Sequence, residues 1–230
     1  LSASPGLMTD STSSQVATEV GTGSLIAPLV EESLKGLAVL IVFLRFRPEF
    51  DSVLDGIIYA AIVALGFAAT ENSWYIYRGY ADGGWNGLWA LVFIRVVLVG
   101  LQHPFYTAFI GIGLAISRLS PQLLVRWLVP LLGWSVAVFA HAFHNTVALT
   151  LGGGFGLVAS TVLDWSGWIA LAAFTVWAIW RDGLCLRRQL KEEVEYGRLT
   201  PEQYKTASSA LAQFAAGIST TRTSFCRTGC

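Results

Sequence analysis

Five long apolar stretches constrain this chain more than any other feature of its sequence. They cover residues 24–44, 55–77, 96–117, 127–151 and 157–180. A helix needs about 20 apolar residues to cross the hydrocarbon core of a bilayer, and each stretch has enough. Residues 86–95, just before the third stretch, are expected to lie at the membrane interface. The sequence therefore predicts an all-α, polytopic transmembrane helix bundle with about five spans.

The overall composition agrees with a membrane protein. Hydrophobic residues make up 54% of the 230 residues, and charged residues only 13%. Soluble domains carry roughly a quarter charged residues, so this chain has too few for a soluble surface. The formal net charge is zero, which gives no support for a nucleic-acid partner. The expected environment is the lipid bilayer of a cell membrane.

The basic residues predict how the bundle is oriented. The connections after the first, third and fifth stretches are basic, with Arg45, Arg47, Arg118, Arg126, Arg181, Arg187, Arg188 and Lys191. The connection after the second stretch has only Arg78, and the one after the fourth has none. Because basic loops stay in the cytoplasm, the N-terminus is predicted outside the cell and the C-terminus inside.

Three regions follow from this arrangement. Residues 1–23 are rich in Ser, Thr and Gly and are expected to form a polar extracytoplasmic extension, and residues 24–180 the transmembrane core. Residues 181–230 mix charges at helical spacing and are expected to form a cytoplasmic helical tail. Within it, Thr200 and Gln203 have the spacing of a capping box that opens a helix. The three cysteines, Cys185, Cys226 and Cys230, give no disulfide framework or zinc motif.

Four of the apolar stretches contain polar groups that a membrane disfavours. They are Glu31, Glu32 and Lys35 in the first, Glu71 and Asn72 in the second, Gln102 and His103 in the third, and His141, His144 and Asn145 in the fourth. At 1.5 Å per residue, Glu31, Glu71 and His103 each lie about 10 Å from the outer end of their stretch. Asn145 and His141 lie about 9 and 15 Å in. Helices of alternating direction therefore bring these groups to one level, in the outer half of the bilayer.

Taken singly, each of these groups has a structural explanation. A lone histidine or asparagine in a membrane helix commonly donates a hydrogen bond to a neighbouring helix. The two adjacent glutamates alone also fit an ion or proton relay, or a structural pair with Lys35. Arg95 and Asp164 are expected to lie at the interface or to extend toward it. The convergence of acids, imidazoles and an amide from four helices is what indicates a site.

Such a set can hydrolyse an amide in two ways. In one, His103, His141 and a carboxylate bind a divalent metal such as zinc, and another glutamate acts as the general base. In the other, no metal takes part, and Glu31 accepts a proton from water while the histidines and Asn145 stabilise the oxyanion. The local spacing contains no HExxH motif, so the sequence leaves both mechanisms open.

Four motifs in order resemble those of the PrsW family of intramembrane proteases. They are EESLK at 31–35, FAATEN at 67–72, the histidine at 103 and HAFHN at 141–145, which together cover about half of the chain. The family is a distant relative of the CAAX prenyl proteases. The resemblance implies a membrane-embedded peptidase that cuts a membrane-anchored protein, such as a bacterial anti-sigma factor, near its extracytoplasmic side.

The resemblance also implies roles for individual residues. Glu31 and Glu32 take the role of the first motif, with water activation at one of them, and Lys35 supports them. Glu71 matches the acid of the second motif, with Asn72 beside it, while His103 and His141 match the later histidines. Asn145 is the expected oxyanion donor, and His144 is an additional imidazole. If a metal is bound, the expected ligands are Glu71, His103 and His141.

Two other functions remain open at this point. A proton- or ion-coupled transporter could use Glu31, Glu32 and Lys35 as its relay, although transporters of that kind often have repeated halves and no repeat is evident here. A catalytically inactive scaffold is the other alternative.

Overall fold

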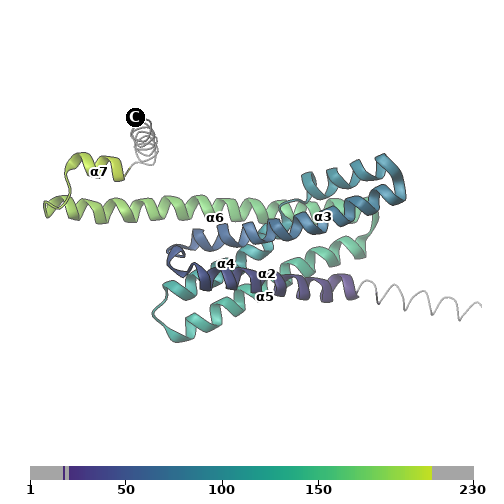
Figure 1. The fold of residues 1–230 in the computed structure, drawn as a ribbon, viewed down its shortest axis with the longest axis horizontal. Helices are drawn as coiled ribbons and strands as arrows, with labels where there is room; N and C mark the ends of the chain where they lie inside the picture. The colour runs from purple at the N-terminus through teal and green to yellow at the C-terminus, as the bar shows by residue number, and fades with distance from the viewer. Residues whose placement is uncertain (1–17, 19–20, 209–230) are drawn as a thin grey trace, which may run out of the picture. The chain divides into compact units, whose positions relative to one another are not determined.

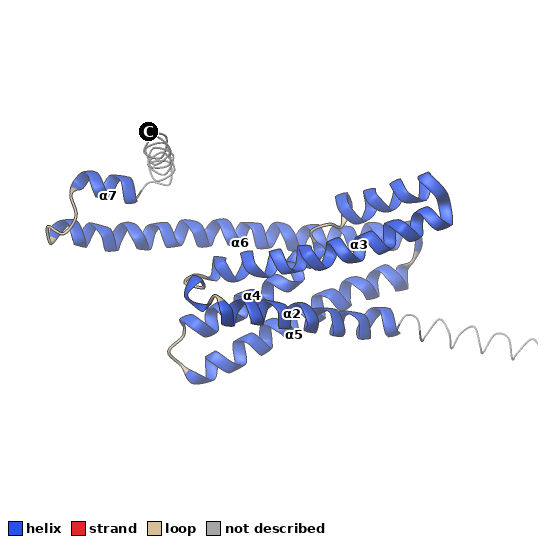
Figure 2. Ribbon diagram, in the orientation of Figure 1, coloured by secondary structure: helices blue, strands red, loops and turns tan. Residues whose placement is uncertain are grey.

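The fold is all-helical, as the sequence predicts. The structure is a computed structural model that describes residue 18 and residues 21–208. No strand occurs among those residues (Figures 1 and 2). The elements are η1 (Thr22–Ile26), α2 (Ala27–Arg45), η2 (Arg47–Glu49), α3 (Val53–Val92), η3 (Phe93–Leu98), α4 (Gln102–Leu119), α5 (Leu123–Leu151), α6 (Gly153–Glu195) and α7 (Pro201–Ala207). The chain divides into two units, residues 1–173 and 174–230, and the polar residues of interest belong to the first.

Within the described residues, three helical stretches are long and apolar enough to cross a membrane. They are Val53–Leu119, Leu123–Leu151 and Gly153–Glu195. The first contains the second and third stretches expected from the sequence. The non-helical residue Gly84 lies between these two stretches, and non-helical backbone from Val99 to Leu101 interrupts the third stretch near its start. The first expected stretch corresponds to α2, which is about 28 Å long but has too many charged residues to qualify by composition. The chain is therefore a polytopic helical membrane protein.

The α3 helix contains a sharp turn that the sequence analysis did not foresee. The helix itself begins at an N-terminal cap formed by Ser52 and Asp55. The side chain of each of these residues accepts a hydrogen bond from the backbone N–H of the other. At Gly84 the backbone leaves the helix, with φ 59° and ψ −147°, a conformation open to glycine alone among common residues. The chain reverses there into a helical hairpin (Figure 1). Gly79 and Gly87 face each other across it with no room for a Cβ on Gly87.

Close helix contacts through glycine hold α3, α4 and α5 together. A Cβ on Gly111 of α4 would overlap the carbonyl oxygen of Gly56 in α3. In the same way, a Cβ on Gly133 of α5 would overlap the carbonyl oxygen of Phe109 in α4. Small residues at such contacts allow the backbones of membrane helices to pack closely. A buried apolar cluster continues this packing toward one end: Val39, Phe43, Phe50, Ala60, Ile110, Leu114, Ala115 and Ala137.

The α2 helix separates its charges from its apolar side chains. Glu32 and Lys35 are 0% and 2% exposed, whereas Leu34, Leu37 and Ile41 are each more than half exposed. A helix that turns its charges inward and its leucines outward is suited to a lipid surrounding. The charged side chains of α2 therefore avoid the free-energy cost of contact with lipid hydrocarbon, because they are buried inside the protein.

Part of the expected domain division falls outside the described residues. Of the polar extension 1–23, only residue 18 and residues 21–23 are described, and 22 and 23 already belong to η1. In the expected tail, α6 continues without a helix end past residue 181 to Glu195. The capping box is confirmed, because Thr200 and Gln203 cap α7. Cys185 is exposed and unpaired, and Cys226 and Cys230 lie outside the described residues.

Candidate active site

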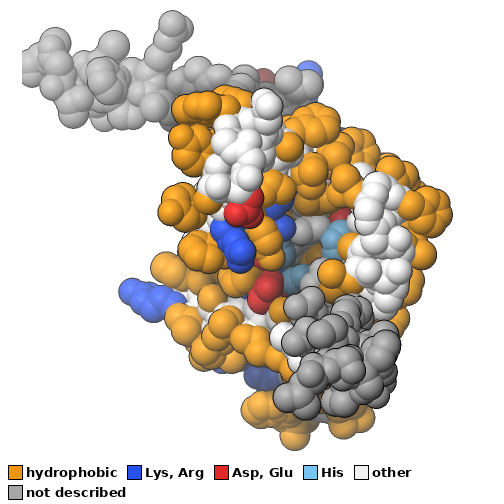
Figure 3. All heavy atoms as spheres, turned by 90° about the vertical axis from the view of Figure 1, so that its right-hand side faces the viewer, with side chains coloured by type: hydrophobic (Ala, Val, Ile, Leu, Met, Phe, Trp, Pro, Cys, Tyr) orange, Lys and Arg blue, Asp and Glu red, His pale blue; other side chains and the backbone are white. Residues whose placement is uncertain are grey.

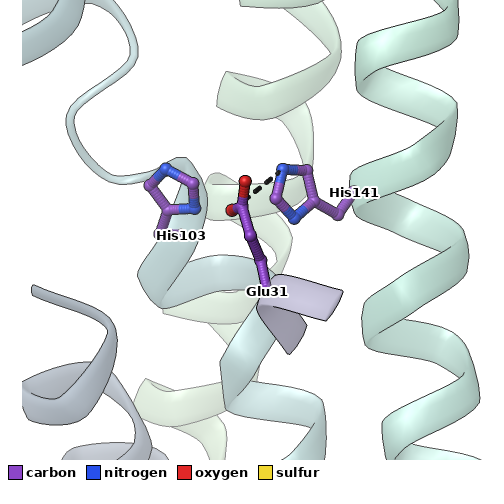
Figure 4. A group of neighbouring side chains, drawn as sticks. All are labelled: Glu31, His103 and His141. Atoms are coloured by element: carbon purple, nitrogen blue, oxygen red, sulfur yellow. Dashed lines mark ion pairs between the residues drawn. The ribbon is translucent and has the colours of Figure 1, made fainter. Parts of the chain in front are cut away.

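Glu31, His103 and His141 come from three different helices and face one another. They lie on α2, α4 and α5, and their side chains point into a common space (Figure 4). One ligand atom from each lies within 4.8 Å of the others. Oε2 of Glu31 is 3.9 Å from Nε2 of His141, too far for a direct hydrogen bond. A water molecule or a substrate atom can bridge two groups at that separation.

Lys35 lies at the centre of this group. Its Nζ is 2.8 Å from Oε1 of Glu32, 2.9 Å from Nδ1 of His103 and 3.4 Å from Oε2 of Glu31. It also lies 4.1 Å from the ring centroid of Phe67. One turn of helix separates Lys35 from the two glutamates, so the local sequence alone brings them together.

Glu32 is buried, and both of its carboxylate oxygens have hydrogen-bond partners. Its Oε1 accepts from Lys35 and lies 3.0 Å from Nδ1 of His141, and its Oε2 accepts from the Thr107 hydroxyl at 2.9 Å. Its side chain is 0% exposed, whereas that of Glu31 is 20% exposed. Glu32 therefore fixes His141 and Lys35, and Glu31 is the glutamate with access to water.

Glu71 holds His103 from the other side. Its Oε2 is 2.9 Å from Nε2 of His103 and 2.8 Å from a terminal nitrogen of Arg95. Nε of Arg95 donates to Oδ1 of Asn72 at 2.7 Å, and its guanidinium lies 3.9 Å from the ring centroid of Tyr75. The Gly84 turn brings Arg95 back alongside Glu71. The sequence analysis placed Arg95 at the interface and so missed this ion pair.

Asn145 and His144 lie outside the group around Glu31. Asn145 donates from Nδ2 to the Gly23 carbonyl at 2.8 Å, which ties α5 to η1. The oxyanion role expected for it has no support from these contacts. His144 lies 3.0 Å from Asp164 through its Nδ1.

A second polar cluster forms around Asp164 on α6. The Tyr106 hydroxyl donates to Oδ1 of Asp164 at 2.5 Å, and the Tyr106 ring stacks on His141 with centroids 5.0 Å apart. Asp164 is 5% exposed, so its side chain is packed inside the protein and does not extend toward the surface as expected. It lines a cavity of about 230 Å³ together with Gln102 and Trp168. This cluster braces the face of His141 opposite the shared space.

The polar groups are visible from one end of the first unit. Figure 3 shows a hollow ringed by apolar side chains, with histidine and charged side chains at its floor. The chain has only three histidines, His103, His141 and His144, so the pale-blue atoms in this hollow belong to them. Within the group, the Glu31 side chain is 20% exposed, whereas those of His103 and His141 are each 4% exposed.

The donor atoms fit a divalent metal in type, and one from each residue lies within 4.8 Å of the others, but the Lys35 ammonium contacts two of the three residues. A carboxylate and two imidazoles are common zinc ligands. Each histidine has a carboxylate on one ring nitrogen, Glu71 for His103 and Glu32 for His141, and this is the usual outer support of metal-binding histidines. Of the other two ring nitrogens, Nδ1 of His103 faces Lys35 and Nε2 of His141 faces Glu31. Among the described residues the grouped carboxylate is Glu31, and not Glu71 as expected from the sequence.

A helical membrane protein that gathers three carboxylates, two imidazoles and a lysine in a hollow has the parts of a membrane-embedded hydrolase. Comparison with known proteins identifies the family. Residues 2–179 match the PrsW family intramembrane metalloproteases, and the chain belongs to that family.

Relatives from three bacteria support this membership. Protease PrsW of Clostridioides difficile (strain 630) is 49% identical over 53 residues, covering 23% of this chain and 22% of the relative. Protease PrsW of Geobacillus kaustophilus (strain HTA426) is 43% identical over 96 residues, or 42% and 39% of the two chains. Protease PrsW of Bacillus subtilis (strain 168) is 32% identical over 138 residues, or 57% and 58%.

These matches extend over part of each relative. The chain spans between 22% and 58% of the length of these curated relatives. No solved structure gives a significant match to it.

Proposed function

We propose that this chain forms the catalytic core of an intramembrane protease, which hydrolyses a peptide bond of a membrane-anchored protein near its extracytoplasmic side. The carrying observation is that Glu31 faces His103 and His141 and that its side chain is 20% exposed. Family membership supports the same activity. A membrane-anchored anti-sigma factor is the substrate class that we propose, following the family resemblance.

Charge balance selects Glu31 as the residue that handles water. Three carboxylates, Glu31, Glu32 and Glu71, face two basic side chains, Lys35 and Arg95. Lys35 lies 2.8 Å from Glu32, and Arg95 lies 2.8 Å from Glu71. Glu31 is left with the longer 3.4 Å contact to Lys35. The carboxylate with the weakest cationic contact is therefore Glu31, and unlike the buried Glu32 it is partly exposed, so it can accept a proton from water.

The reaction would use the remaining groups in fixed roles. Glu31 takes a proton from water as the oxygen attacks the substrate carbonyl carbon. Nδ1 of His141 faces Glu32, so its Nε2 is the nitrogen that can pass the proton taken up by Glu31 to the departing amine as the C–N bond breaks. Lys35 supplies the positive charge that favours an oxyanion nearby. His103, held by Glu71 and Lys35, forms the opposite wall of the space.

Glu31, His103 and His141 would also hold a divalent cation. Such a cation would supply Lewis acidity for polarising the substrate carbonyl. The Lys35 ammonium already contacts two of the same residues, Glu31 and His103, and its position would have to adjust. Chelator treatment followed by metal analysis of the purified protein separates the two forms of the mechanism.

Cleavage by purified protein tests the proposal. The full chain, reconstituted in liposomes with a single-span membrane protein as substrate, should release a fragment cut near the extracytoplasmic end of the span. Glu31→Ala and His141→Ala variants should remove the activity. Ser33→Ala is a control on the same helix, because Ser33 lies two residues from Glu31 on α2 but is exposed, and within the described chain its hydroxyl bonds only the Leu29 carbonyl and the Trp134 indole. Wild-type rates in folded Glu31→Ala protein would refute the mechanism.

A further inference from the structure

A large apolar groove lies between α2, α4 and α5, apart from the polar cluster. Its volume is about 600 Å³, and none of the polar-cluster residues lines it. Apolar side chains form most of its wall, including Leu37, Leu40, Ile110 and Leu114. It runs along α2 from Ser33 to Leu44, a distance of about 17 Å at the rise of an α-helix, and reaches Arg47 just beyond the helix end. One leaflet of hydrocarbon is about 15 Å deep, so the groove can hold the length of an acyl chain.

Three arginines line the same groove at one end. Arg47 follows α2, Arg118 is in the last turn of α4, and Arg126 is in the first turn of α5. The C-terminal ends of α2 and α4 and the N-terminal end of α5 therefore gather their positive charges at one level. Within the described part of the chain, none of the three forms an ion pair with a carboxylate.

Arg118 is held in place at this end by the fold itself. Its Nε donates to the carbonyl oxygen of Phe50 at 3.0 Å. Phe50 is fully buried and stacks on Tyr59, so this carbonyl has a fixed position. A guanidinium anchored through Nε still presents its terminal nitrogens, and such groups bind phosphate oxygens in pairs.

We propose that this groove is a binding site for one anionic phospholipid, with its phosphate against Arg47, Arg118 and Arg126 and one acyl chain along α2. An acyl chain satisfies the apolar wall, and an anionic headgroup satisfies three cations that form no close ion pair within the described part of the chain, Asp51 acting on Arg118 only at longer range. The arginine-rich connections are those predicted to face the cytoplasm, where anionic lipids are abundant. The proposal does not depend on whether the chain is a protease.

Lipid binding by the purified full chain tests this proposal. Native mass spectrometry would compare dioleoyl phosphatidylglycerol with dioleoyl phosphatidylcholine, which share acyl chains and differ in headgroup charge. We expect phosphatidylglycerol to bind at least tenfold more tightly. The Arg47→Gln/Arg126→Gln variant should lose about 25-fold in affinity for it, since each arginine contributes about fivefold near an anionic lipid. Affinity for phosphatidylcholine should change little.

A matched variant separates the site from general charge attraction. Arg45→Gln/Arg78→Gln removes the same two charges from positions that do not line the groove. It should keep the preference for phosphatidylglycerol, whereas an equal loss in both double variants would overturn the proposal. Equal binding of the two lipids by the wild-type protein would also overturn it. So would equal binding of glycerol phosphate, because that result would leave the acyl groove without a role.

Discussion

Lys35 donates to Nδ1 of His103 across 2.9 Å and thereby determines which ring nitrogen of that histidine carries the proton. An ammonium group has no lone pair, so Nδ1 must accept. The proton then lies on Nε2, which donates to Glu71 at 2.9 Å. His103 is thus fixed between a cation from α2 and an anion from α3.

The two adjacent glutamates should respond differently to substitution. Glu31→Gln should abolish cleavage while changing stability little, because Glu31 is partly exposed and makes only long contacts. Glu32→Gln should destabilise the protein by about 3–5 kcal/mol, because it leaves the buried Lys35 short of its closest partner. Thermal unfolding in detergent, measured beside cleavage, distinguishes them. Equal melting temperatures for the two variants would contradict this division.

Arg95 should act on the site through Glu71. Arg95→Met keeps the length of the side chain but removes the 2.8 Å ion pair, so Glu71 no longer holds His103 firmly. We expect cleavage to fall by about 10–100-fold, the usual effect of losing such outer support. The Michaelis constant should change less than the turnover number. Arg95→Lys should restore part of the rate.

Arg78→Met provides the control for that experiment. Arg78 lies on the same helical hairpin but is exposed. Its variant should cleave at the wild-type rate. If Arg95→Met did so as well, Glu71 would not need Arg95 to hold His103.

Tyr106 and Asp164 should be coupled in stability. Tyr106→Phe removes a buried hydroxyl that donates to Asp164 at 2.5 Å and should cost about 1–3 kcal/mol. A double-mutant cycle with Asp164→Asn should give a coupling energy within about 0.5–3 kcal/mol. Tyr59→Phe in α3 is the matched change, since the Tyr59 ring stacks on Phe50. Its effect should add to that of Asp164→Asn, and the same additivity at Tyr106 would argue against the bond.

Two glycines of α3 should give opposite results when changed to alanine. Gly56→Ala places a methyl group against the backbone of Gly111 and should destabilise the protein by about 1–3 kcal/mol. Gly66→Ala has open space and should be neutral or stabilising by up to about 1 kcal/mol, from helix propensity alone. Unfolding in detergent measures both. A tolerated Gly56→Ala would mean that α3 and α4 separate easily.

The sequence was sufficient to predict which polar residues gather, because depth in a membrane follows from counting. A regular rise along helices of alternating direction brings Glu31, Glu71, His103 and His141 to one level, and the structure has them in contact. Their catalytic roles stay predictions. The fold class could also be predicted from the sequence, because long apolar stretches that cross a membrane can form only a few kinds of fold.

Counting could not predict which way a side chain faces or where a helix reverses. Asn145 has the expected depth but turns toward Gly23. Arg95 was assigned to the interface because the turn at Gly84 was not recognised, although the Gly83-Gly84 pair is a signal for one. Asp164 belongs to a stretch with one isolated acid, and only tertiary packing brings Tyr106 and His144 to it.

The turn at Gly84 also bears on how the chain enters a bilayer. Glu71 and Arg95 lie on the two arms of one hairpin, so their ion pair can form before α4 and α5 are made. The acid would then be inserted already neutralised by its own neighbour, at much lower cost than a lone carboxylate. During synthesis, the Glu71–Arg95 part of the site could enter the bilayer before the remaining helices pack against it.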